Sequence, residues 1–206
     1  SGYLYNAGAA VMFSIGQGQY LSVSPLQLAT GYAAIANGGT LYKPTLAKAV
    51  VAPNGEVVRT IEPTVAGTVP VSQETLAYIR NALVGVTTEP GGTATGVFAD
   101  WPSDIIPIAG KTGTAEVEGK KDTSWFASFA PAHDPQYAVV VTIPESGTGS
   151  EYAAPVAKEI YKAIFGVGQP AAQPGGRPPS ELPRLNRDGT FTLVSGPSSG
   201  SAAGEP

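Results

Sequence analysis

The chain has 206 residues, of which 42% are hydrophobic, and its formal net charge is −4 at pH 7. This length can bury one core, with or without a tail. Binding nucleic acid requires a clustered surplus of Lys and Arg, so the acidic balance argues against that class of function. The absence of cysteine excludes disulfides and thiolate nucleophiles, and a single histidine makes a metal centre improbable on composition.

The N-terminal residues, SGYLYNAGAA, have neither an initiator Met nor the charged and apolar blocks of a signal peptide. No run approaches the ~18 apolar residues of a membrane helix. We therefore expect this sequence to be a piece of a longer chain, with any export signal or membrane anchor upstream.

Two helices and a hairpin are predicted in the first half. Ser24 is a candidate N-cap, followed by Pro25 at the first helical position and Gln27 three residues after the cap, and this helix ends near residues 37–39. Residues 45–52 and 56–61 are rich in β-formers and are joined by Pro-Asn-Gly, which indicates a hairpin. A second helix is predicted from Ser72 to Pro90.

Three strands are predicted next, at residues 106–117, 123–131 and 137–145. Short, turn-rich joins predict an antiparallel meander, and the apolar third strand should be covered on both faces. A last helix at about 152–165 should pack on this sheet, which makes the fold class α+β. Its expected apolar stripe is Ala153, Val156, Ala157, Ile160 and Ile164.

The last forty residues contain 7 Gly, 7 Pro and 5 Ser. Such a segment cannot bury enough apolar surface to offset the entropy of ordering it, so residues 167–206 are predicted to be a disordered tail after a domain at 1–166. Residues 189–194 alternate like a strand, but no partner strand is evident in the sequence.

The tetrapeptide Gly110-Lys111-Thr112-Gly113 first suggests a nucleotide phosphate loop. That motif needs another glycine at position 105, where the sequence has Ile105, and it must lead into a helix rather than a strand. The alternative is the Lys-Thr-Gly strand motif of penicillin-binding proteins and class A β-lactamases. From the tetrapeptide alone, a glycine-interrupted strand with a solvated lysine is as good a reading.

Further segments resemble the class B penicillin-binding proteins, which are peptidoglycan D,D-transpeptidases. The resemblance runs from about Phe13 to Phe165 and implies the C-terminal half of a penicillin-binding protein/serine β-lactamase-like transpeptidase domain. The matching segments are SIGQGQYLSVSPLQLATGYAAIANGGTLYKP, GGTA at 91–94, AGKTGTAE at 109–116, SWFASFAP at 124–131 and AAPVAKEIYKAIF at 153–165.

The resemblance implies catalytic roles for Lys111, Thr112, Gly113 and Thr114. The lysine would supply the positive field, the two threonines would bind the substrate carboxylate, and the Thr114 N–H would be half of an oxyanion hole. The substrates would be stem peptides ending in D-Ala-D-Ala, with β-lactams as their mimics. Neither composition nor resemblance calls for a cofactor or metal.

Other candidate residues have both a functional and a structural interpretation. Trp125 is expected either to line the substrate groove or to pack in the core. Glu116 is expected either to bind substrate or to form, with Glu118, the charged end of a hairpin. His133 lies in a predicted turn and should be solvated. Residues 146–152 could be a mobile lip of the site or a simple connection, and 91–94 a helix stop or a site-edge loop.

The family's Ser-x-x-Lys and Ser-x-Asn motifs are absent from the 206 residues. We expect an upstream part of the same protein to carry them, and this chain alone to be inactive. The resemblance also implies a place on the extracytoplasmic face of the bacterial cytoplasmic membrane, with other cell-wall synthesis proteins as partners. Two alternatives remain, namely a serine β-lactamase and a non-catalytic β-lactam sensor or cell-wall assembly module.

Overall fold

The computed structural model describes residues 7–18, 21–168, 171, 184–185 and 191–192. The chain divides into one compact unit of residues 1–42 and 65–172 and another of residues 43–64 and 173–206. Nearly all of the predicted tail lies outside the described residues, so its predicted disorder stays a prediction.

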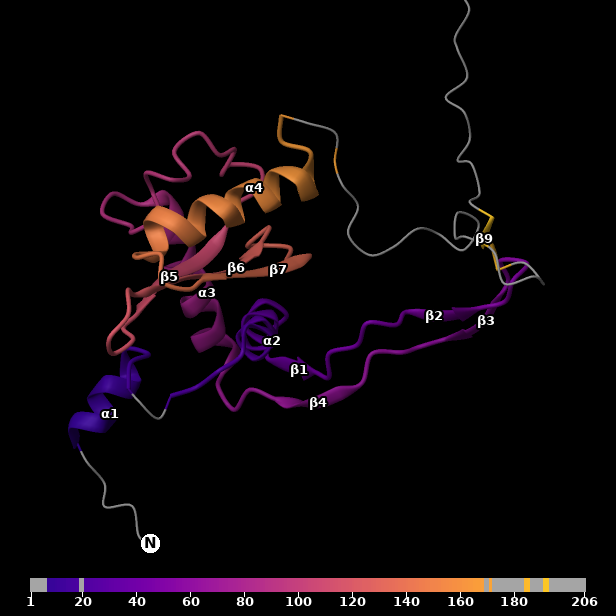
Figure 1. Ribbon diagram of the computed structural model, residues 1–206, viewed down its shortest axis with the longest axis horizontal. Coiled ribbons are helices and arrows are strands. Elements are labelled where there is room, and N and C mark those ends of the chain that lie inside the picture. Colours follow the sequence, from indigo (N-terminus) through magenta and orange to yellow (C-terminus); the bar gives the residue numbers. More distant parts are fainter. Residues whose placement is uncertain (1–6, 19–20, 169–170, 172–183, 186–190, 193–206) are drawn as a thin grey trace, which may run out of the picture. The chain divides into compact units, whose positions relative to one another are not determined.

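The first unit is organised around a three-stranded antiparallel sheet (Figure 1). Its strands are β5 (Ala109–Ala115), β6 (Thr123–Ala130) and β7 (Tyr137–Ile143), in the order β5-β6-β7. The predicted meander is confirmed, although β5 starts three residues later than expected. The carbonyl of Ile106 accepts a hydrogen bond from Trp101 Nε1 at 2.6 Å, and Pro107 has no N–H to donate, so the regular ladder begins only at Ala109, although the Pro107 carbonyl accepts from the Ala132 N–H at 2.7 Å.

Both predicted helices of the first half are confirmed with their caps. α2 spans Pro25–Ala36, and Ser24 and Gln27 form a reciprocal capping box at its start. α3 spans Gln73–Thr88, and the Ser72 hydroxyl accepts from the backbone N–H of Thr75. These caps fix where both helices begin.

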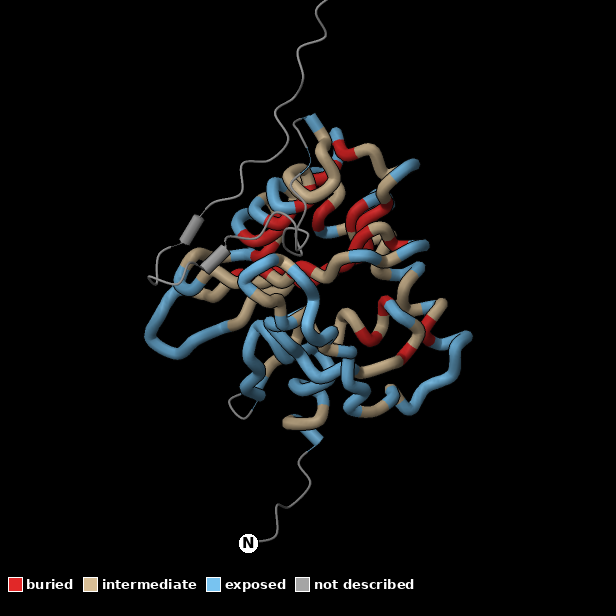
Figure 2. Tube along the Cα trace, turned by 90° about the vertical axis from the view of Figure 1, so that its right-hand side faces the viewer, coloured by how far each residue is buried: buried red, intermediate tan, exposed pale blue. Residues whose placement is uncertain are grey.

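Helices cover both faces of the sheet, as expected for the apolar strand β7. On one face Ala109, Phe129 and Ala138 pack with side chains of α2 and α3. On the other face Phe126, Val139 and Val141 pack with α4 (Ala154–Phe165) and with the single-turn π-helix η1 (Gly149–Ala153) that precedes it. Figure 2 shows most of the buried residues, in red, gathered in the sheet and the segments packed on it.

The apolar stripe predicted for α4 is wrong in part. Val156 and Ile160 are 42% and 37% exposed, whereas Tyr161 is fully buried. The Tyr161 hydroxyl lies 3.0 Å from Ser128 Oγ, and burial raises its pKa. Two stripes were compatible with the helical period, and the small side chains Ala154 and Ala157 allow the helix to approach the sheet closely on the tyrosine side.

Besides η1, three short elements of the first unit were not predicted. α1 (Ala7–Ser14) has no buried residue and no amphipathic pattern to reveal it. β1 (Thr40–Tyr42) pairs with β4 (Val65–Thr68) in a two-stranded antiparallel sheet. Strands of three or four residues are too short to show alternation.

The second unit contains the predicted hairpin, which is confirmed as β2 (Ala49–Val51) paired with β3 (Val57–Thr60). It also contains β8 (Arg184–Leu185), which pairs with β9 (Phe191–Thr192) within the stretch where a strand was predicted. Among the described residues, no helix combines the length and apolar character that crossing a bilayer requires.

Candidate active site

The Lys-Thr-Gly motif lies in the middle of β5, at an edge of the sheet. Lys111 is opposite Ala127 on β6, Thr112 is opposite Phe126 and Gly113 is opposite Trp125. Within the described residues no strand pairs with the other side of β5. The motif therefore presents backbone groups that can bind another chain.

Two side-chain contacts show which backbone groups face the open edge. The Thr112 carbonyl accepts from Lys111 Nζ at 2.9 Å, and the Thr114 carbonyl accepts from Gln17 Nε2 at 2.8 Å. Both carbonyls therefore point away from β6. Because the N–H and C=O of one strand residue point to the same side, the N–H groups of Thr112 and Thr114 also face the open edge.

The Lys111 ammonium group reaches the hydroxyl side of the strand. On an ideal strand Lys111 and Thr112 point to opposite faces. Here the flexible lysine side chain bends around the edge, so that Nζ lies 3.4 Å from Thr112 Oγ1 as well as 2.9 Å from the Thr112 carbonyl. A cation and a hydroxyl therefore meet at one point of the edge.

An open cleft of about 320 Å³ adjoins this point. Its walls are the last turns of α3, the residues that follow this helix, and Lys111. The lining residues are Ala82, Gly85, Val86, Glu89, Pro90, Gly91, Gly92, Thr93 and Lys111. The segment 91–94 is thus both the predicted helix stop and part of the cleft wall beside the motif.

On the face of the sheet that α4 covers, β5 is in direct contact with η1. A Cβ added at Gly149 would lie 2.3 Å from the Trp125 carbonyl oxygen and 2.6 Å from that of Gly113. Only glycine fits at this position. The middle of the segment 146–152 is therefore packed against the motif strand, which favours the reading of this segment as a structured connection.

The structure separates the remaining predicted site residues. Trp125 is half-buried and opposite Gly113, so by strand alternation it shares the Lys111 face, whereas Phe126 is buried in the core. Glu116 is exposed and lines a second cleft of about 600 Å³ together with Glu118 and Asp122. That cleft does not include Lys111.

The only histidine is in neither of those two clefts. His133 is exposed in the turn after β6, as predicted, and lines a small cleft of about 130 Å³ beside Arg80 and Asn81. Its position gives no support to a role at the Lys-Thr-Gly edge.

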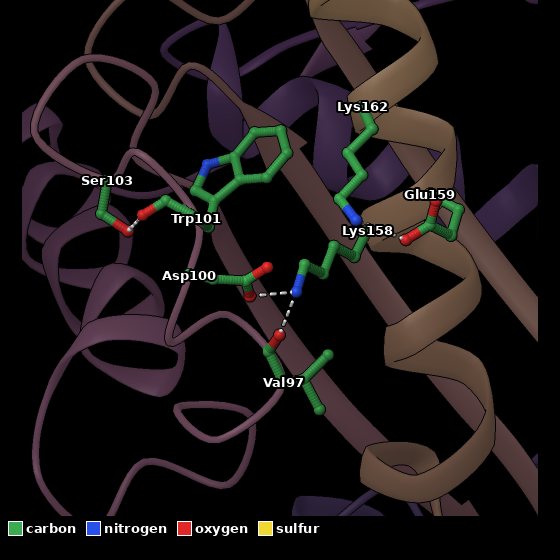
Figure 3. A network of polar contacts seen from close by, with 7 residues as sticks. All are labelled: Val97, Asp100, Trp101, Ser103, Lys158, Glu159 and Lys162. Atoms are coloured by element: carbon green, nitrogen blue, oxygen red, sulfur yellow. Dashed lines mark hydrogen bonds and ion pairs between the residues drawn. The ribbon is translucent and has the colours of Figure 1, made fainter. Parts of the chain in front are cut away.

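The segment between α3 and β5 is tied to α4 by Lys158 (Figure 3). Lys158 Nζ donates to the Val97 carbonyl at 2.8 Å and forms an ion pair with Asp100. The hydrogen bond from Lys158 lowers the pKa of Asp100 below its usual value. Phe98 and Trp101 of the same segment are buried in the core, with their rings edge to face.

A family model described as the penicillin binding protein transpeptidase domain matches residues 3–164. The chain belongs to this family. This confirms the resemblance from the sequence, and solved transpeptidase structures with helices on an antiparallel sheet confirm the α+β, penicillin-binding protein-like fold class.

Two relatives show the level of similarity to known penicillin-binding proteins. The probable peptidoglycan D,D-transpeptidase PenA of Neisseria gonorrhoeae is 35% identical over 155 residues, which is 72% of this chain and 24% of PenA. The peptidoglycan D,D-transpeptidase PbpA of Mycolicibacterium smegmatis is 31% identical over 179 residues, which is 82% of this chain and 34% of PbpA. The chain thus spans about a quarter to a third of these proteins.

Two solved structures are similar in fold. PBP2 of Pseudomonas aeruginosa, in complex with WCK 5153, has a TM-score of 0.67 and 30% identity over 85% of this chain and 37% of its own. The imipenem acyl-enzyme of penicillin-binding protein A from M. tuberculosis has a TM-score of 0.62 and 30% identity, over 75% of this chain and 33% of its own.

Two residues that contact the Lys-Thr-Gly strand were missed by the sequence reasoning. Gln17 contacts Thr114 although 97 positions separate them, and Thr93 lies with its hydroxyl oxygen 2.7 Å from that of Thr112. The sequence singled out the segments that contain them, SIGQG and GGTA, but nothing in the sequence indicated which side chain of each segment reaches β5.

Proposed function

We propose that this chain supplies the Lys-Thr-Gly side of the active site of a peptidoglycan D,D-transpeptidase that is acylated by β-lactams. The observation that carries the proposal is the edge of β5 that no described strand pairs with, where the Lys111 ammonium meets the Thr112 hydroxyl and the N–H of Thr114, two residues further along, faces the same side. Relatives named as D,D-transpeptidases, and an acyl-enzyme of a related protein with imipenem, support it.

In the proposed reaction a serine Oγ attacks the carbonyl carbon between the last two D-alanines of a stem peptide. The peptide C–N bond breaks, the terminal D-alanine leaves with the proton, and an ester to the serine remains. An amine of a neighbouring stem peptide then attacks the ester, forms the cross-link and frees the serine. A β-lactam forms the same ester by opening its ring amide.

The described residues have distinct roles in this reaction. The Thr114 N–H stabilises the oxyanion that forms during each attack. Lys111 and the hydroxyls of Thr112 and Thr114 bind the terminal carboxylate, and Gly113 leaves room for the substrate backbone along the edge. Trp125 lines the face of the sheet from which the Lys111 side chain starts, and Glu116 contacts a more distant part of the stem peptide.

The nucleophilic serine is proposed to come from outside these 206 residues, because no serine here is followed at the third position by lysine. It would belong to an upstream part of the same protein that carries Ser-x-x-Lys and Ser-x-Asn. We place that protein at the extracytoplasmic face of the bacterial cytoplasmic membrane, anchored upstream, where it works with other cell-wall synthesis proteins.

The test is Lys111→Ala in the complete protein, assayed by acylation with a fluorescent penicillin. We expect at least about a 100-fold lower acylation rate, because the cation that holds the ligand carboxylate is lost. Lys111 is exposed, so the free energy of unfolding should change by less than about 0.5 kcal/mol.

Lys121→Ala is the matched control, since this lysine is exposed in the turn after β5. It should label at the wild-type rate. Undiminished labelling of Lys111→Ala would remove Lys111 from the mechanism and, with it, the proposed site.

A further inference from the structure

We propose that Thr93 is a positioning residue that directs the hydroxyl proton of Thr112 toward the ligand carboxylate. The inference rests on the proposed function, because it concerns how the Lys-Thr-Gly edge recognises an anion. Thr93 belongs to the turn after α3, 19 residues before Thr112, and the two hydroxyl oxygens are 2.7 Å apart.

The hydrogen-bonding capacity of the Thr112 hydroxyl makes its orientation important. A threonine hydroxyl has one proton to donate and two lone pairs to accept with. Lysine only donates, so Thr112 Oγ1 uses one lone pair for Lys111 Nζ, at 3.4 Å. If Thr93 donates to the second lone pair, the Thr112 proton is left for an external acceptor.

A carboxylate is the acceptor that fits this arrangement. It accepts from the Thr112 hydroxyl while the adjacent Lys111 ammonium balances its charge. A Thr112 hydroxyl without Thr93 is free to turn its proton elsewhere, and binding a carboxylate then has to reorient it. Thr93 thus prepares the hydroxyl before the ligand arrives.

The turn that carries Thr93 is held firmly to α3. The N–H of Gly92 donates to the Glu89 carbonyl at 2.9 Å, and that of Ala94 donates to the Val86 carbonyl at 3.0 Å. A Cβ at Gly92 would lie 2.5 Å from the Gly85 carbonyl oxygen, so the turn is packed directly on the helix backbone. Ala94 is fully buried, while the Thr93 side chain is exposed beside the cleft.

The same segment is fixed at its other end. The Thr95 hydroxyl donates to the Glu89 carbonyl at 2.7 Å, and Lys158 of α4 binds the Val97 carbonyl at 2.8 Å. Contacts on both sides of Thr93 therefore hold its hydroxyl where it meets Thr112. Thr93 can orient the Thr112 hydroxyl only if its own hydroxyl is held in place, and these contacts hold it.

The experiment compares Thr93→Val and Thr93→Ser in the complete protein. Valine keeps the shape of threonine and removes the hydroxyl, whereas serine keeps the hydroxyl. We expect Thr93→Val to lower the acylation rate with a fluorescent penicillin about tenfold, which is what one well-oriented hydrogen bond contributes, and Thr93→Ser to stay within about twofold of wild type.

A second ligand separates positioning from a structural effect. The methyl ester of the same penicillin has no carboxylate, and its slower adduct formation can be followed by intact-protein mass. Thr93→Val should change the ester rate by less than about twofold, because an uncharged ester carbonyl accepts a much weaker hydrogen bond from the oriented proton than a carboxylate does. An equal loss with acid and ester, or no loss with the acid, would overturn the role of Thr93.

Lys111→Ala distinguishes the failure of this inference from failure of the proposed function. If Lys111→Ala abolishes acylation while Thr93→Val labels normally, Thr93 has no positioning role but the site stands. If both variants label normally, the proposed site itself is wrong.

Discussion

Two glycines from distant parts of the chain meet at the Lys-Thr-Gly strand. Gly113 lies on β5, and Gly149 begins η1, 36 residues later; Gly149 has no space for a Cβ against the Gly113 and Trp125 backbones. Backbone atoms of two paired strands, β5 and β6, cannot move aside as a flexible side chain can. The place of the motif strand therefore depends on the absence of a side chain at Gly149.

Gly149→Ala tests this contact. The added methyl group must displace β5 or η1, so we expect the free energy of unfolding to fall by about 1–3 kcal/mol, measured by denaturant titration. Because β5 carries the residues proposed to bind the substrate carboxylate, the acylation rate should fall as well.

Gly96→Ala is the matched control for this substitution. A Cβ at Gly96 would meet no heavy atom within 4 Å. Its stability should stay within about 0.5 kcal/mol of wild type. Equal stability of the Gly149 and Gly96 variants would show that the contact of Gly149 with the backbone of Gly113 and Trp125 does not constrain β5.

The segment between α3 and β5 runs from a helix on one face of the sheet and packs against α4 on the other face. Phe98 and Trp101 anchor it in the core, and Lys158 holds Val97 and Asp100 (Figure 3). The Lys158 side chain is 12% exposed while that of Asp100 is 70% exposed. The lysine is thus a nearly buried cation whose partners are a backbone carbonyl and one carboxylate.

This ion pair predicts a pH dependence of stability. The pKa of Asp100 is lowered in the folded state, chiefly by the hydrogen bond from Lys158. Its contribution is therefore complete above the unfolded value, about 3.9, and is lost as the pH falls through the lower folded value. Thermal melts should show Asp100→Asn less stable than wild type at pH 6–7, with the difference shrinking as the pH falls below the unfolded value of about 3.9.

Asp104→Asn is the control, because Asp104 is an exposed carboxylate of the same segment with no ion pair in the described part of the chain. Its melting temperature should track that of wild type at every pH. A difference for Asp100→Asn that persists unchanged at pH 2 would show that the ion pair is not its source.

The 206 residues hold the carboxylate-binding edge of the proposed site and no Ser-x-x-Lys sequence. The relatives they match are about three to four times longer than the matched part. The residues that bind the substrate carboxylate and the nucleophilic serine are thus proposed to lie in different parts of one protein.

This division predicts that the 206-residue chain forms no covalent adduct with penicillin, as followed by intact-protein mass. The complete protein, with the proposed upstream serine, should gain the mass of one penicillin under the same conditions. A stoichiometric adduct on the 206-residue chain would show that a serine within it is the nucleophile.

Local signals predicted the elements well. The caps at Ser24 and Ser72 and the turn-rich joins between β5, β6 and β7 act within a few residues, so the sequence reports them directly. The helix α4 was also predicted, but its buried side was not, because two stripes satisfy the helical period and the choice depends on the shape of the sheet it meets.

The motif and its family were evident from the order of segments along the chain, and so were the residues expected to bind a carboxylate. Three contacts were not evident from the sequence, namely those of Gln17 with Thr114, of Thr93 with Thr112, and of Gly149 with the Gly113 backbone. Each joins positions 19 to 97 residues apart, and no local pattern records which distant side chain will arrive. Those partners follow from the path of the folded chain, because packing and edge pairing bring together groups that the linear order keeps apart.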